Sequence, residues 1–197
     1  MLVAAVLVVA AYLVGMFPAA QVVSRRTGHD PTAEGSGNPG ATNVWRVAGR
    51  RAGALVAVID VAKGALPTLF ALGVADRPTG YAVWVAAVVG HVWPITRRLR
   101  GGKGVATAGG GGLVLNPLVG VACIVMFVAV VRLVRIAALG SLGIAVGYPT
   151  LLALSGQPGW EVATASGVAV ILFVRHQSNI RRLIRGEEST TDCAGPV

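Results

Sequence analysis

The sequence predicts an all-helical protein that crosses a membrane several times within one domain. Three observations favour this fold class. Hydrophobic residues make up 54% of the 197 residues and charged residues only 13%, whereas soluble domains carry about 25% charged residues. The apolar residues come in runs long enough to span a bilayer. The basic residues, which give a net charge of +9, gather in the polar segments between those runs, as the positive-inside rule predicts.

The same composition argues against other classes. In a soluble protein this positive charge would suggest nucleic acid binding, but here it suits loops that face anionic lipid headgroups. We therefore expect membrane lipids, and no nucleic acid, as partners. Cys123 and Cys193 lie in an apolar run and in the polar tail, so no disulfide is expected, and the three histidines lack metal-ligand spacing. No metal or other cofactor is expected.

The first half of the chain contains three apolar runs. Residues 1–23 form the first, which contains no Lys or Arg and therefore lacks the basic start of a signal peptide. Two arginines follow it and place the N-terminus outside. A polar segment at 24–51 leads to a second span at 52–73, and a short turn around Arg77 leads to a third span at 80–95.

The apolar stretch 105–131 permits two topologies. One helix through it would place Arg132 and Arg135 outside, whereas two crossings that meet at Asn116-Pro117 would place them inside. The second choice, with further spans at 137–154 and 160–174, gives seven passes, a cytoplasmic C-terminus and all but two of the 17 Lys and Arg on the cytoplasmic side. It requires a helix of only about 16 Å over residues 105–115, which protein must shield from lipid.

Seven passes bring four polar segments to the cytoplasmic face. These are residues 24–51, 96–104, 132–135 and 175–188. We expect one transmembrane domain over residues 1–188. The Ser-Thr-Thr-Asp composition of the remaining tail, residues 189–197, is typical of disorder.

Two of these segments are glycine-rich and basic. They read Gly35-Ser36-Gly37-Asn38-Pro39-Gly40-Ala41-Thr42-Asn43-Val44-Trp45-Arg46 and Arg100-Gly101-Gly102-Lys103-Gly104-Val105-Ala106-Thr107. Glycines let backbone N–H groups approach an anion, and cations neutralise it. The first is not a dinucleotide loop because no strand precedes it, and the second departs from a nucleotide P-loop at two positions. They are either flexible linkers or, as their polar residues favour, parts of one phosphate site.

Ionisable residues inside the spans point to the same face. Asp60 and Lys63 are three residues apart, so they share a helix face and form either a structural ion pair or part of a polar cavity. His91 ends the third span, where it either bonds across helices or lines the site.

Further candidates follow the fifth span. Ser141 either donates to a phosphate or bonds back to its own helix. His176 and Asn179 are three residues apart, so a helical extension could present both to the site. Glu187, in an otherwise basic tail, could pair with a neighbouring arginine.

Taken together, these motifs resemble the bacterial acyl-phosphate:glycerol-3-phosphate acyltransferases, the PlsY family, over nearly the full length. The motifs are GSGNPGATNVWR at 35–46, Asp60-x-x-Lys63-Gly64, Gly90-His91-x-x-Pro94, Gly101-Gly102-Lys103-Gly104-Val105-Ala106-Thr107 and Arg175-His176-x-x-Asn179-Ile180-x-Arg182-Leu183. The resemblance implies a seven-helix bundle in the cytoplasmic (inner) membrane, with the N-terminus outside and the site on the cytoplasmic side.

The resemblance also implies an activity and a set of site residues. The family transfers an acyl group from acyl phosphate to the 1-hydroxyl of glycerol 3-phosphate, yielding lysophosphatidate and phosphate, and the soluble enzyme that forms acyl phosphate is a further expected partner. Implied catalytic residues are Ser36, Arg46, Lys103, His176 and Asn179. Implied substrate-binding residues are Gly35, Gly37, Asn38, Gly40, Thr42, Asn43, Lys63, Gly101, Gly102, Gly104, Thr107 and Ser141. This chain carries Ala138 where family members often have a serine.

The physical chemistry suits that reaction. Two phosphate dianions ~5 Å apart repel by roughly 13 kcal/mol at an effective dielectric of 20, so cations and donors are needed to bring them together. An acyl phosphate is already activated, so positioning and charge stabilisation suffice. Either His176 or the substrate's own phosphate takes the hydroxyl proton. A transporter of a phosphorylated anion is the alternative, but no inverted repeat is evident, and a scaffold would not need the glycine loops.

Overall fold

The computed structural model describes residues 1–191, and every regular element in that range is a helix. The all-helical class is therefore confirmed. By length and composition, four helical segments could cross a membrane, and Val105–Leu115 is a shorter apolar helix; the four are Leu2–Arg25, Arg50–Val74, Pro117–Val134 and Ala137–Leu154. Most of the tail that we expect to be disordered, residues 192–197, lies outside the described residues.

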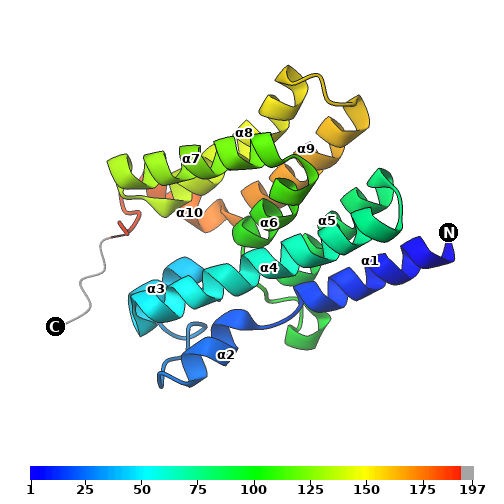
Figure 1. Ribbon diagram of the computed structural model, residues 1–197. Helices are drawn as coiled ribbons and strands as arrows, with labels where there is room; N and C mark the ends of the chain where they lie inside the picture. The colour runs from blue at the N-terminus through cyan, green and yellow to red at the C-terminus, as the bar shows by residue number, and fades with distance from the viewer. Residues whose placement is uncertain (192–197) are drawn as a thin grey trace. The chain divides into compact units, whose positions relative to one another are not determined.

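The chain forms two compact units, the first covering Met1–Gly111 and the second beginning at Gly112, and Figure 1 labels the α-helices of both. The elements are α1 (Leu2–Gly15), α2 (Ala19–Arg25), α3 (Ala41–Ala48), α4 (Arg50–Val74), α5 (Arg77–Val92), the 3-10 helix η1 (Ile95–Arg97), α6 (Val105–Leu115), α7 (Pro117–Val134), α8 (Ala137–Leu154), α9 (Gly159–Arg175) and α10 (Gln177–Ile184).

The first apolar run, predicted to be long enough to span the membrane, corresponds to the candidate span Leu2–Arg25, and it consists of two helices. α1 ends at Gly15 and α2 begins at Ala19. The residue before a proline is disfavoured in the helical region, so Pro18 interrupts the backbone at Phe17. The break leaves the carbonyl groups at the end of α1 in need of other donors.

Glycines allow α1 and α5 to pack closely. A Cβ at Gly15 would overlap the backbone of Ala87, and a Cβ at Gly90 would overlap the carbonyl oxygen of Tyr12. Small residues permit this approach between membrane helices. The Tyr12 hydroxyl donates to the Trp93 carbonyl at 2.8 Å and thereby ties α1 to the end of α5.

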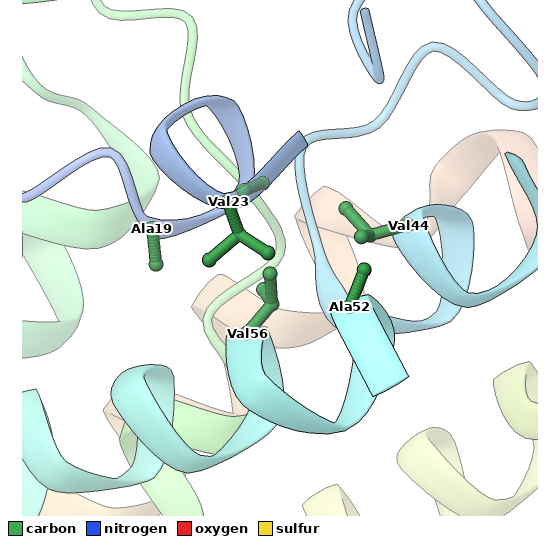
Figure 2. Packing of buried hydrophobic residues seen from close by; sticks show 6 residues of the cluster. Ala19, Val23, Val44, Ala52 and Val56 are labelled. Carbon is green, nitrogen blue, oxygen red and sulfur yellow. The ribbon is translucent and has the colours of Figure 1, made fainter. Parts of the chain in front are cut away.

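The polar segment 24–51, predicted without regular structure, contains α3. This helix and α2 pack on the start of α4 through a cluster of small apolar side chains (Figure 2), whose buried members are Ala19, Ala20, Val23, Val44, Ala52 and Val56. α3 also lies close to α4 at Gly53, where a Cβ would meet Trp45. Burial of one face explains why this short helix forms within a polar stretch.

In the second unit α7 packs on α8, α8 on α9, and α10 follows α9. The predicted interruption at Asn116-Pro117 is confirmed, since α6 ends at Leu115 and α7 begins at Pro117. The Tyr148 hydroxyl donates to the Gly112 carbonyl at 2.8 Å and holds α8 against the end of α6.

Candidate functional site

A buried asparagine shapes the first glycine-rich segment. The Asn43 side-chain oxygen accepts the backbone N–H of Ser36 at 2.9 Å. Its amide nitrogen donates to the carbonyls of Pro31 at 2.9 Å and Glu34 at 3.0 Å. Gly35 has a φ of +60°, which turns the chain so that Ser36 reaches Asn43. The side chain of Ser36 remains exposed, held at a fixed place by its backbone.

α3 carries the other candidate residues of this segment. Thr42 and Arg46 are four residues apart and therefore share a face of the helix. Thr42 is exposed and Arg46 half-buried. Gly40 precedes the helix in an extended conformation, and a Cβ there would come within 2.8 Å of the Asn38 side-chain nitrogen. The segment thus presents its hydroxyl, its cation and several glycines from one compact turn and helix.

The second glycine-rich segment lies directly on the end of α5. The N–H groups of Gly101 and Gly102 donate to the carbonyls of Val92 at 3.1 Å and His91 at 3.2 Å. A Cβ at Gly102 would overlap the His91 ring, and one at Gly101 would overlap the His91 carbonyl oxygen. Only glycine fits at either position, so the backbone beside the half-buried Lys103 is held firmly.

Beneath this loop lies a buried polar cluster. Lys63 Nζ is 2.8 Å from Asp60 Oδ1, which confirms the predicted pairing on one face of α4. His91 Nδ1 is 3.7 Å from the same carboxylate oxygen and 3.2 Å from Thr107 Oγ1. Thr107 comes from α6, whose backbone lies so close to α4 that a Cβ at Gly64 would overlap the Thr107 carbonyl oxygen. His91 therefore bonds across helices to Thr107 and packs against the second glycine-rich segment at Gly102.

A second cation joins this cluster from the loop after α5. Arg97 donates to the Met16 carbonyl at 3.4 Å, and Lys63 donates to the Phe17 carbonyl at 3.2 Å. Both cations thus interact with the carbonyl end of α1, which carries partial negative charge. Partial burial lowers the pKa of Arg97, while Asp60 acts in the opposite direction, and a guanidinium remains cationic.

Sequence reasoning did not single out Arg97. Its charge was accounted for by the positive-inside pattern of the loop, and no short-range spacing links it to Asp60 or to the break after α1.

In the second unit, α9 and α10 meet at two candidate residues. His176 Nδ1 lies 2.8 Å from the Leu172 carbonyl oxygen. A carbonyl only accepts, so Nδ1 carries the proton, and in the neutral ring Nε2 is the basic nitrogen. Asn179 donates from Nδ2 to Glu188 Oε1 at 2.8 Å, and Arg182 Nε binds Glu188 Oε2 at 2.8 Å. His176 and Asn179 are almost fully buried, 2% and 4% exposed.

Two further candidates of the second unit make contacts within it. Ser141 bonds back to its own helix, donating to the Ala137 carbonyl at 2.9 Å. The acidic residue that pairs with an arginine is Glu188, which corrects the expectation for Glu187. Gly186 has a φ of +71° and turns the chain back, so that Glu188 faces α10 while Glu187 is exposed.

Comparison with known proteins shows the family of this chain. A family model described as glycerol-3-phosphate acyltransferase matches residues 5–186. The chain belongs to this family. The glycerol-3-phosphate acyltransferase of Thioalkalivibrio sulfidiphilus is 42% identical over 95% of this chain and 94% of its own length. That of Myxococcus xanthus is 42% identical over 92% of this chain and 96% of its own length.

Solved structures of PlsY, an integral membrane glycerol 3-phosphate acyltransferase, have the same fold. Its glycerol 3-phosphate form is 32% identical and matches 95% of this chain and 94% of that chain with a TM-score of 0.91. Its lysophosphatidic acid form matches with a TM-score of 0.89 over the same shares. The resemblance to the PlsY family is thus confirmed, and the chain is an integral membrane acyltransferase.

Proposed function

We propose that this protein transfers a fatty acyl group from acyl phosphate to the 1-hydroxyl of glycerol 3-phosphate. The products are lysophosphatidate and phosphate. One observation carries the proposal: the chain matches, nearly end to end, a PlsY that has been solved in a glycerol 3-phosphate form and a lysophosphatidic acid form. These two molecules differ by one acyl group, so they correspond to acceptor and product. The acyl phosphate donor rests on the sequence motifs.

The membrane arrangement in this proposal has seven passes in the cytoplasmic membrane. The N-terminus lies outside, and the glycine-rich segments face the cytoplasm, where both glycerol 3-phosphate and the soluble enzyme that forms acyl phosphate are found. The charge distribution of the loops supports this orientation. A reporter enzyme that works only in the cytoplasm should be active when it is fused after residue 188. Activity of a reporter that works only outside the membrane would overturn the orientation.

Phosphate binding is the task of the first unit. Arg46 and Lys103 supply the charge that offsets repulsion between the two substrates. Ser36 supplies a hydroxyl donor from a backbone that Asn43 holds in place. The glycines beside Lys103 fix its backbone, because the N–H groups of Gly101 and Gly102 donate to the carbonyls of Val92 and His91. Because hydrogen bonds hold the backbones of Ser36, Gly101 and Gly102 before the substrates arrive, the two segments can stabilise developing charge with little rearrangement.

Acyl transfer itself needs one proton acceptor. The glycerol hydroxyl oxygen attacks the carbonyl carbon of the acyl phosphate, and a new C–O ester bond forms. The bond from that carbon to the phosphate oxygen then breaks, and its electron pair leaves with phosphate. The hydroxyl proton passes either to His176 Nε2, the basic nitrogen when Nδ1 donates to the Leu172 carbonyl, or to a substrate phosphate.

The test uses membranes from a host that lacks this activity. Labelled glycerol 3-phosphate and palmitoyl phosphate should yield lysophosphatidate, and palmitoyl-CoA should not replace palmitoyl phosphate. Lys103→Ala and Ser36→Ala should abolish turnover while the protein still inserts. Arg100→Ala removes an exposed cation from the same loop and should retain most activity. Absence of product from palmitoyl phosphate, or equal use of palmitoyl-CoA alone, would overturn the proposal.

A further inference from the structure

The ring of His91 lies where three segments of the first unit meet. His91 is in the last turn of α5 and is 5% exposed. Its Nδ1 is 3.2 Å from Thr107 Oγ1 on α6 and 3.7 Å from Asp60 Oδ1 on α4. Gly102 packs against the other nitrogen, since a Cβ on Gly102 would overlap Nε2 and lie 3.1 Å from both Cδ2 and Cε1 of the ring. Each ring nitrogen therefore faces a different segment of the protein.

These contacts fall on both sides of Lys103 in the chain. Gly102 directly precedes Lys103, and Thr107 follows it in the first turn of α6. The chain thus leaves the His91 ring at Gly102 and returns to it at Thr107. The turn that carries Lys103 is therefore built around this one side chain.

The ring has a role that the backbone hydrogen bonds to α5 do not fill. The N–H groups of Gly101 and Gly102 donate to the carbonyls of Val92 and His91, and these carbonyls would be present with any side chain at position 91. The ring sets how closely Gly102 approaches α5, because the three atoms nearest to a Cβ there all belong to it. The Thr107 hydroxyl in turn ties the ring to the first turn of α6.

Direct contact with a substrate does not suit either residue. Thr107 is 0% exposed and His91 5%, and both ring nitrogens face protein atoms. A general acid or base has to come within hydrogen-bond reach of its substrate. The half-buried Lys103 is the group that this segment offers to a phosphate. Its stem is long and flexible, so the place of its ammonium group depends on where its backbone is held.

We propose that His91 and Thr107 are positioning residues for acyl transfer, which hold the backbone on both sides of Lys103 and so direct its ammonium group to a substrate phosphate. The inference rests on the proposed function, in which Lys103 binds phosphate. It assigns Thr107 a contact with His91 in place of a contact with substrate. Displacement of a phosphate-binding cation weakens substrate binding and raises KM. A general loss of folding reduces the number of active molecules and leaves the KM of the remainder unchanged.

The first test measures KM for both substrates in His91→Asn. Asparagine keeps a polar group near the place of Nδ1 and removes the ring edge that faces Gly102. KM should rise about fivefold or more for glycerol 3-phosphate, for palmitoyl phosphate or for both. Val88→Ala is the matched control, since Val88 is 0% exposed on the same helix; it should lower the unfolding temperature in detergent and leave both KM values unchanged. Unchanged KM values in a folded His91→Asn would overturn the inference.

The second test asks whether the ring and Gly102 act through one contact. Gly102→Ala should raise the same KM as His91→Asn, because its Cβ meets the ring. His91→Asn makes room for that Cβ, so kcat/KM of His91→Asn/Gly102→Ala should stay within about threefold of the value for His91→Asn. A further loss of about tenfold in the double variant would show that the methyl group meets something other than the ring, and would overturn the inference.

Thr107 provides a third test, which gives a result even if His91→Asn does not fold. Thr107→Val removes the hydroxyl and should raise KM, and Thr107→Ser, which keeps the hydroxyl, should restore most of the affinity. Added to His91→Asn, Thr107→Val should change KM little further. Independent effects that multiply would mean that Thr107 contacts the substrate, and would overturn its assignment. A wild type that forms no lysophosphatidate from palmitoyl phosphate would instead refute the proposed function.

Discussion

Removing the carboxylate of Asp60 should leave two cations without their shared counter-ion. Asp60 and Lys63 are 3% and 5% exposed, and their charged atoms are 2.8 Å apart. In Asp60→Ala, Lys63 would keep only the Phe17 carbonyl among the partners described for it. The change therefore breaks a buried ion pair and leaves an uncompensated charge within an apolar helix.

The expected cost follows from that burial. Breaking a buried pair by removing one partner costs about 3–5 kcal/mol, which is at least a hundredfold in the folding equilibrium at about 1.4 kcal/mol per factor of ten. Asp60→Asn keeps the shape and removes the charge, so it should lose a large part of the same free energy. The double variant Asp60→Ala/Lys63→Met removes both charges and should recover most of the loss, because hydrophobic replacement of a buried pair is often nearly neutral.

Unfolding in mixed micelles, followed by tryptophan fluorescence, measures these differences. The double-mutant cycle isolates the pairwise interaction. If Asp60→Ala lies within about 1 kcal/mol of the wild type, or if the double variant is as unstable as the single one, the ion pair does not stabilise the fold and the reasoning is refuted.

Three further outcomes are expected. Gly102→Ala puts a Cβ into the His91 ring and should lower turnover at least tenfold with little change in unfolding temperature; near-normal kinetics would show that the loop has room. Tyr12→Phe removes the hydrogen bond to the Trp93 carbonyl and should lower the free energy of unfolding by about 0.5–1.5 kcal/mol in the same assay. An unchanged free energy of unfolding would show that this bond does not link α1 to α5. Hydrogen bonds from Thr32 lower the pKa of Asp30 below its ordinary value of 3.8. These bonds should therefore order the segment fully above pH 3.8 and be lost as the pH falls through the lowered pKa of the folded protein. Amide exchange of the segment that does not change on acidification would contradict this.

Local patterns in the sequence were sufficient for the fold class and for several contacts. Low charge and long apolar runs predict membrane helices because lipid excludes unpaired polar groups. Asn116-Pro117 marks a helix boundary through the geometry of proline, and the structure has it there. The three-residue spacing of Asp60 and Lys63 predicts a shared helix face, and their atoms meet. The motifs identify the family for the same reason, since each is a short run with a fixed order.

Contacts between distant segments required the tertiary structure. No local signal places Arg97 at the end of α1 or shows that Asn43 holds the backbone of Ser36. Nor does spacing alone distinguish Glu188 from Glu187 as the partner of the arginine in α10.

By itself, then, the sequence determined what kind of protein this is, and it indicated the glycine-rich segments as its candidate site. The tertiary structure decided how those segments are held: one by a buried asparagine, the other by a histidine ring against Gly102. It also placed Thr107 of α6 against the same ring. The physical reason is that periodicity and composition report burial along one helix, whereas a site depends on side chains that only packing brings into contact.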